Sequence, residues 1–258
     1  MLGAIAGDII GSVYEWNNIK TKSFELFSPK SKFTDDSVLT VATMDSIING
    51  KSFDESYKKW FRRYPDAGFG GGFKKWGMSE KMKPYNSYGN GSAMRVSPIG
   101  LYYNSLEEVL SKAEESAIVT HNHPEGIKGA KATAAAIFYA TNGSGKEEIK
   151  NYIEESFGYN LNESIDSIRT WYSFDVSCQG SVPQAIRSFL ESNSYEDTLR
   201  NAISIGGDSD TIACIAGGIA EAYYRKIPEY IVYEAKELLS KEMKEVLKIY
   251  YTKIGRDI

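Results

Sequence analysis

The sequence predicts an all-α protein that folds as one domain. Apolar residues recur at the helical period of 3.6 residues along the whole chain, whereas the alternation typical of half-buried strands is scarce. Small polar and acidic residues stand where several of these segments begin, as they do at helix starts. No repeat with a period of about 20–50 residues and no linker rich in proline or serine divides the chain. We therefore expect a single domain over residues 1–258.

Composition limits the classes of function. Hydrophobic residues make up 42% of the 258 residues and charged residues 25%, values typical of a packed globular protein. The formal net charge of −4 leaves no basic surplus to neutralise phosphates, so nucleic-acid binding is not expected. The only cysteines are Cys178 and Cys214, which favours a reducing, cytoplasmic location. Residues 1–10 have no basic start and include Asp8, unlike a signal peptide or a membrane span. We expect a monomer that does not bind membranes.

The first predicted helix has a face of glycines. Gly3, Gly7 and Gly11 recur every four residues, so another backbone can approach this face closely. Tight packing is the expected role of the glycines. Asp8 and Glu15 are seven residues apart, and on one helix they would share a face. For Glu15, a functional role and simple solvent exposure both stay open.

Two further helices begin at capping signals. Thr34-Asp35-Asp36-Ser37 precedes an apolar-periodic run that Gly50 ends. Ser194 precedes an acidic first turn, and Gly206 stands where that helix must end in a left-handed residue. Near the end of the chain, residues 229–250 carry one continuous apolar stripe between charged faces, which predicts a single amphipathic helix.

Two pairs of aspartates stand at predicted helix starts, Asp35 with Asp36, and Asp208 with Asp210. Capping alone explains one Asp per helix but not two. If the pairs converge, carboxylates about 5 Å apart repel by roughly 3 kcal/mol at an effective dielectric constant near 20. Two divalent cations of the Mg²⁺ or Mn²⁺ type would relieve this repulsion. Capping and metal binding are both consistent with the spacing.

Neutral hydroxyl groups flank these carboxylates. Thr34 and Thr211 offer oxygens that would complete the coordination of a hard cation. A calcium hand is excluded, because Asp208-Ser209-Asp210 lacks the third acidic position, the loop glycine and the final glutamate.

Glycine-rich segments predict loops at residues 68–73 and 89–92. The second, Gly89-Asn90-Gly91-Ser92, is followed by Arg95, and such a loop can hold a diphosphate through backbone N–H groups or can be a plain turn. His121 and His123 have no third histidine or nearby cysteine to complete a zinc site. A hydrogen-bonded structural or pocket pair is the expected role of these histidines.

Five motifs together resemble the ADP-ribosylglycohydrolase family, which includes dinitrogenase reductase-activating glycohydrolases and ADP-ribosyl-arginine hydrolases. Each motif is weak alone, but the five occur in order across residues 1–228. They are Gly7-Asp8-Ile9-Ile10-Gly11 with Glu15, Thr34-Asp35-Asp36-Ser37, Gly89-Asn90-Gly91-Ser92, Thr120-His121-Asn122-His123-Pro124, and Gly206-Gly207-Asp208-Ser209-Asp210-Thr211. Ser37, where members often have Thr, and Ser209 depart from the pattern, and neither is a predicted ligand.

The resemblance implies an orthogonal all-α fold with a dinuclear Mg²⁺ or Mn²⁺ centre in a cleft. The ligands that it implies are Thr34, Asp35, Asp36, Asp208, Asp210 and Thr211. Asp35, Asp36 or Glu15 would accept the proton of the attacking water. The substrate-binding residues would be Gly89, Asn90, Gly91, Ser92 and His123.

The function that the resemblance implies is removal of ADP-ribose from a modified protein, by hydrolysis of its N-glycosidic bond to arginine. Two alternatives stay open. The chain would hydrolyse another linkage, to serine, in an ester or in a free ADP-ribose derivative, or it would bind ADP-ribose without catalysis, since a fold does not fix a function. All six predicted ligands are present, which favours an enzyme.

Overall fold

A computed structural model describes residues 1–256 and confirms the all-α prediction. Within these residues the chain forms no strand, and its only β-type pairing is a single bridge between Gly89 and Ser177. The helices are α1 (Leu2–Gly11), α2 (Asp35–Asn49), α3 (Phe53–Arg63), α4 (Gly71–Met78), α5 (Gly91–Met94), α6 (Ser97–Tyr102), α7 (Leu106–Ile118), α8 (Pro124–Thr141), α9 (Lys146–Phe157), α10 (Ile165–Trp171), α11 (Cys178–Leu190), α12 (Tyr195–Ser204), α13 (Ser209–Tyr224), α14 (Glu229–Leu238) and α15 (Lys241–Lys253).

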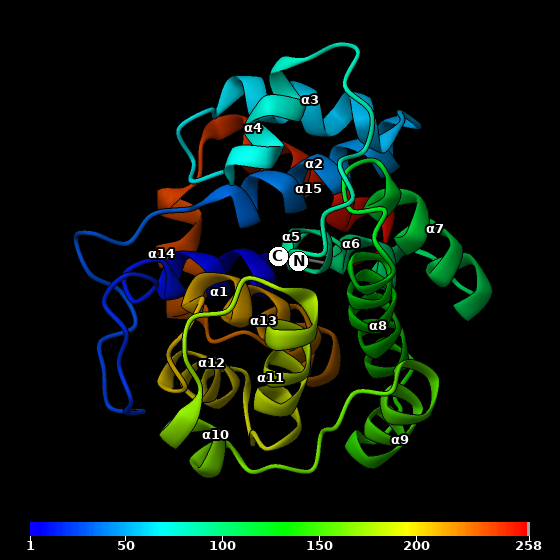
Figure 1. The fold of residues 1–258 in the computed structure, drawn as a ribbon. Helices are drawn as coiled ribbons and strands as arrows, with labels where there is room; N and C mark the ends of the chain where they lie inside the picture. The colour runs from blue at the N-terminus through cyan, green and yellow to red at the C-terminus, as the bar shows by residue number, and fades with distance from the viewer. Residues whose placement is uncertain (257–258) are drawn as a thin grey trace.

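The helices cross one another at varied angles around a central pair, α1 and α13 (Figure 1). Helices α11 and α12 pack on one side of α13, and α8 packs on another. The last helix, α15, packs against α2 from the first part of the chain. The buried apolar side chains form one cluster that includes residues from α1 and from α15. Segments from both ends of the sequence therefore meet at the centre of the molecule.

The capping signals predicted the start of α2 and of α12 correctly. The Thr34 hydroxyl accepts from the N–H of Asp36, and Ser194 accepts from the N–H of Asp197. Gly50 ends α2 with a φ of 62°, and Gly206 follows α12 with a φ of 73°. Both angles lie in the left-handed region that glycine adopts without strain.

The prediction of one helix over residues 229–250 was wrong. Leu239 is extended and buried, and the helix α14 ends before it. Ser240 then caps α15, because its hydroxyl accepts from the N–H of Met243 at 3.3 Å. The apolar stripe is continuous in sequence but belongs to two helices.

Asp8 and Glu15 do not lie on one helix, contrary to the sequence prediction. Helix α1 ends at Gly11, and the Asn18 amide then donates to the carbonyls of Tyr14 and Glu15 at 2.7 and 2.8 Å. These bonds hold the chain in a turn after α1. Glu15 is thus placed by a loop, residues 12–34, that connects α1 to α2.

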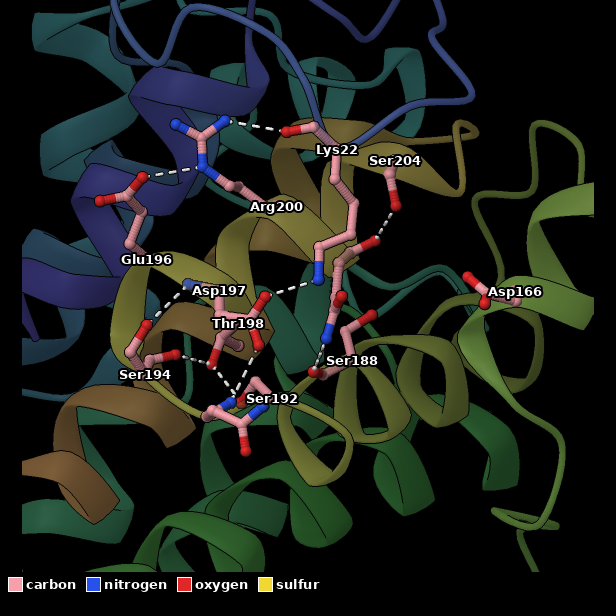
Figure 2. Close-up of polar contacts among 12 residues, drawn as sticks. Lys22, Asp166, Ser188, Ser192, Ser194, Glu196, Asp197, Thr198, Arg200 and Ser204 are labelled. Atoms are coloured by element: carbon pink, nitrogen blue, oxygen red, sulfur yellow. Dashed lines mark hydrogen bonds and ion pairs between the residues drawn. The ribbon is translucent and has the colours of Figure 1, made fainter.

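Polar contacts fix this loop to α12 (Figure 2). The Lys22 ammonium forms an ion pair with Asp197 at 2.5 Å, and Nη1 of Arg200 donates to the carbonyl oxygens of Lys22 and Phe24, both at 2.9 Å. Arg200 is held in turn by Glu196, one helical turn earlier. The loop therefore has defined anchors along its length.

Both cysteines, Cys178 and Cys214, are buried and free. No helix in residues 1–256 combines the length and the apolar character needed to cross a membrane.

Candidate metal centre

Close packing of α1 on α13 brings the first carboxylates together. A Cβ on Gly7 would lie 2.1 Å from the carbonyl oxygen of Ala213, and one on Gly11 would lie 2.5 Å from Cα of Asp210. Side chains at these positions would force the helices apart, which confirms the packing role predicted for the glycines. The contact sets Asp8 of α1 beside the first turn of α13.

Asp8 joins α1 to the start of α2. Its Oδ2 accepts from the N–H of Thr34 at 2.9 Å, from the N–H of Ser37 at 3.0 Å and from the Ser37 hydroxyl. Its Oδ1 accepts from the Thr34 hydroxyl at 2.6 Å. Asp8 is fully buried, and burial raises the pKa of its carboxyl above the ordinary value. This anchoring role was not predicted, although Asp8 belongs to the first sequence motif.

The carboxylates form two groups that share Asp210. Asp8, Asp36 and Asp210 each offer an oxygen within 4.8 Å of the others, and so do Glu15, Asp208 and Asp210. Oδ1 of Asp36 is buried and has no hydrogen-bond partner within the described chain. Such an orphaned oxygen in an acidic cluster fits a hard cation.

The two predicted threonines lie in this cluster. The Thr211 hydroxyl donates to Oδ2 of Asp36 at 3.3 Å, and the Thr34 hydroxyl oxygen lies 3.3 Å from the same Oδ2. The structure therefore brings together Asp36, Asp208, Asp210, Thr34 and Thr211 from two segments about 170 residues apart in sequence. Asp35 stands outside the two groups and lines the adjacent cleft.

The cluster carries an excess of negative charge. None of the ion pairs found in residues 1–256 involves Asp8, Glu15, Asp35, Asp36, Asp208 or Asp210. Burial, and then the charge of Asp208, raises the pKa of Glu15 to about 7. Burial, and then the charge of Asp8, raises the pKa of Asp35 to about 8.

The carboxyls of Asp36 and Asp210 have a pKa well above the ordinary value, because both are buried beside other carboxylates. Bound cations would reverse these shifts, and the all-oxygen donor set fits Mg²⁺ or Mn²⁺.

A cleft of about 350 Å³ opens beside the carboxylates. Its walls include Glu15, Asp35, Asp36, Asp208, Asp210 and Thr211, together with the predicted substrate residues Gly89, Asn90 and Gly91. Asn90 ties the two parts together, because its Nδ2 donates to Oδ2 of Asp208 at 2.6 Å. The glycine loop and the metal cluster therefore face one space.

Two predicted substrate residues, Ser92 and His123, are not among the residues that line the cleft. The Ser92 hydroxyl is buried and donates to the carbonyl of Gly126 at 2.7 Å. Nδ1 of His123 accepts from the N–H of Glu125 at 3.1 Å and caps α8. In these positions both side chains make contacts that stabilise the fold.

His121, the other histidine of that motif, lines the cleft instead. Nη2 of Arg95 donates to the Thr120 hydroxyl at 2.9 Å, and that hydroxyl lies 2.7 Å from Nδ1 of His121. With the hydroxyl donating to Nδ1, the ring proton would be on Nε2. Burial and the charge of Arg95 lower the pKa of His121 well below its usual value. The ring is therefore neutral, and its Nε2 lies beside Gly91.

Trp16, Phe174 and Tyr85 also line this cleft, and no motif predicted them. Their only sequence signal was nearness to a motif, since Trp16 follows Glu15, and aromatic residues are more often buried in a core.

The chain is similar in sequence and in fold to several known proteins. The mouse (Mus musculus) ADP-ribosylhydrolase ARH3 is 28% identical to this chain, over 89% of the chain and 84% of the mouse protein. An uncharacterised protein of Archaeoglobus fulgidus is 32% identical, over 89% of the chain and 88% of that protein. A solved structure, the ADP-ribosylglycohydrolase-related protein complex, shares the fold with a TM-score of 0.73 at 21% identity, covering 98% of this chain and 97% of its own. The family model for ADP-ribosylglycohydrolase matches residues 1–254, and the chain belongs to the ADP-ribosylglycohydrolase family.

Proposed function

We propose that the protein hydrolyses the bond between the distal ribose of ADP-ribose and a protein side chain, with two divalent cations, Mg²⁺ or Mn²⁺, in the carboxylate cluster. The observation that carries the proposal is the pair of carboxylate groups sharing Asp210 at the wall of a cleft that also contains the glycine loop. A binding module without catalysis would not require six carboxylates at one site.

The cations would be held by Asp36, Asp208 and Asp210, with oxygens from Thr34, Thr211 and Asp35. Asp8 is a weaker candidate ligand, because four hydrogen bonds already occupy its two oxygens. When bound, a divalent cation polarises ribose and water oxygens and makes the attacking water more acidic. The orphaned oxygen of Asp36 supports its assignment as a ligand.

Glu15 is the base that we favour among Glu15, Asp35 and Asp36. Its side chain is half-buried at the cleft wall, so water can reach it, whereas Asp36 is buried among the ligands. Its carboxylate groups with those of Asp208 and Asp210, so it lies beside a water that the cations would hold. Glu15 takes a proton from the attacking water, the water oxygen bonds to the anomeric carbon, and the bond to the side chain breaks. The leaving nitrogen or oxygen takes up that proton from Glu15, which restores the Glu15 carboxylate.

The glycine loop would hold the diphosphate. Gly89 and Gly91 carry no side chain that would block close approach, and the neutral ring of His121 would add an Nε2–H donor in the tautomer that accepts from Thr120. This assignment suits a site whose charged groups are acidic, because backbone and neutral imidazole N–H groups bind an anion without a cationic patch.

The linkage is the finer part of the proposal. The resemblance favoured the N-glycosidic bond to arginine, while the relatives named ADP-ribosylhydrolase ARH3 support hydrolysis of ADP-ribose linkages in general, so the linkage to serine is tested beside it. The deciding experiment incubates the protein with ADP-ribosyl-arginine and ADP-ribosyl-serine peptides, with and without Mg²⁺, and measures free ADP-ribose. Release that requires Mg²⁺ and is lost in Asp210→Asn supports the proposal. Binding of ADP-ribose without release from any substrate would make the protein a reader.

A further inference from the structure

Two aromatic side chains stack on each other at the edge of the cleft. The ring centroids of Trp16 and Phe174 lie 5.2 Å apart with an interplanar angle of 27°. Trp16 is 80% exposed and Phe174 43% exposed, although both contribute to the cleft wall. We propose that the Trp16–Phe174 pair binds the polypeptide segment that carries the ADP-ribose, next to the bond that is cleaved. The inference rests on the proposed function and adds a determinant of substrate choice.

Both segments that carry the pair adjoin the carboxylate cluster. Trp16 directly follows Glu15, which groups with Asp208 and Asp210. Phe174 belongs to a segment that contacts the residue before Asp208, since a Cβ on Gly207 would lie 2.4 Å from the Tyr172 ring. The reacting carbon must lie at the carboxylates, so whatever is attached to it leaves the cleft there. Trp16 and Phe174 are exposed aromatic side chains of these two segments, and both line the cleft.

Hydrogen bonds between the two segments hold the aromatic residues in place. The Lys20 ammonium donates to the carbonyls of Tyr172 and Ile205 at 2.6 and 2.5 Å, which joins the loop bearing Trp16 to the segment bearing Phe174. Asn18 and Gly207 exchange two hydrogen bonds of 2.9 and 2.7 Å. Arg200 and Asp197 of α12 also hold the loop that bears Trp16, through their contacts with Lys22 (Figure 2). Rigid aromatic side chains lose little conformational freedom on binding, which suits a contact surface.

A polypeptide fits this position better than the nucleotide does. ADP-ribose is a small ligand that a cleft encloses, whereas a side chain that is 80% exposed meets what extends beyond the cleft. Indole and phenyl faces pack on peptide groups and on aliphatic side chains, and they attract the cations of lysine and arginine. The acidic cluster beside the pair favours the same basic peptides.

The test uses Trp16→Ala and Phe174→Ala, with Trp171→Ala as the matched control. Trp171 is 55% exposed and belongs to the same region of the chain, but it does not line the cleft. We expect both variants to raise KM for a mono-ADP-ribosylated peptide by about tenfold, or ~1.4 kcal/mol. Calorimetry with free ADP-ribose and Mg²⁺ should give a Kd within about twofold of the wild type. The control should behave as the wild type in both measurements.

Three outcomes overturn the inference. An equal loss of affinity for free ADP-ribose would mean that the pair binds the nucleotide, and an unchanged KM would mean that it binds nothing in the substrate.

If the wild type releases no ADP-ribose from any peptide, the proposed function fails. The role of the Trp16–Phe174 pair is then tested separately, by measuring the affinity for the modified peptide. The wild type should then bind the modified peptide more tightly than it binds ADP-ribose, and the two variants should lose that difference. A preference that both variants keep would overturn the inference.

Discussion

The side-chain amide of Asn90 donates a hydrogen bond of 2.6 Å to Oδ2 of Asp208, and this contact joins the glycine loop to the carboxylate cluster. The same nitrogen donates to the Ser181 hydroxyl at 3.0 Å, so the orientation of the amide is fixed by two partners. A residue of the predicted substrate loop thereby orients a predicted metal ligand. Metal binding and substrate binding are expected to depend on each other through this contact.

Replacing Asn90 by alanine should therefore weaken metal binding. Partners that orient a ligand typically contribute about 10–100-fold to metal affinity or activity, and we expect a loss in that range for Mn²⁺ in Asn90→Ala. Titration calorimetry with Mn²⁺ measures it. Asn142→Ala is the control, because the Asn142 amide bonds only to its own helix, at the carbonyl of Phe138. Equal Mn²⁺ affinity in wild type and Asn90→Ala would show that the contact does not orient a ligand.

Asp36→Asn should abolish turnover and leave the fold intact. The change removes a carboxylate whose Oδ1 has no partner in the described chain, so the loss should exceed the ~100-fold typical of residues that only orient a ligand. In EDTA the variant should be at least as stable as the wild type, because one buried negative charge is gone. Release of ADP-ribose and thermal melts test both statements, with the exposed Asp66→Asn as control. Near wild-type turnover at saturating Mg²⁺ would exclude Asp36 as a ligand.

The metal-free protein should lose stability as pH rises. The pKa of Glu15 is raised to about 7 and that of Asp35 to about 8, whereas in an unfolded chain both carboxyls have a pKa of about 4. Between these limits the folded state binds more protons than the unfolded state, so the free energy of unfolding falls as pH increases. Melts in EDTA should show a decrease in Tm from pH 5 to pH 8. Saturating Mg²⁺ should remove most of that slope, and a Tm that rises over this range in EDTA would contradict the arrangement.

Glu15→Gln should lower kcat by about 10²–10⁴-fold, the range typical of a lost general base. The pH–rate profile should lose its acidic limb in this variant, because no carboxylate is left to titrate in that role. Asp35→Asn is the comparison, and it should weaken metal binding while keeping the limb. The reverse result, with the limb lost only in Asp35→Asn, would identify Asp35 as the base.

Much of the fold could be predicted because local signals agreed with tertiary structure. Some residues produce a local structure that depends little on the rest of the chain. The caps Thr34 and Ser194 begin their helices, and the glycines of α1 allow close packing, so the sequence alone predicted these features. The break between α14 and α15 was missed, because Leu239 keeps the apolar pattern while its backbone is extended. Periodicity records which side chains are buried and not where the backbone turns.

Part of the candidate site could be predicted because several of its carboxylates stand in short sequence motifs. Asp36, Asp208 and Asp210 belong to motifs, and the structure groups them. Asp8 was not predicted as an anchor because its partners Thr34 and Ser37 are more than twenty residues away in sequence. His121 and His123 could not be ranked, since which of them faces the cleft depends on the Arg95–Thr120 contact and on the start of α8.

Thermal melts in three conditions measure whether cations in the carboxylate cluster hold ADP-ribose. A ligand at 100 times its Kd stabilises the native state by about 2.7 kcal/mol, and each kcal/mol moves Tm by roughly 2–4 °C in a domain of about this size. We expect Mg²⁺ or Mn²⁺ to raise Tm by about 5–10 °C over EDTA, and ADP-ribose to raise it further only when metal is present. Asp208→Asn should lose most of both shifts. An increase in Tm of equal size on adding ADP-ribose in EDTA would show that the cations do not hold the ligand.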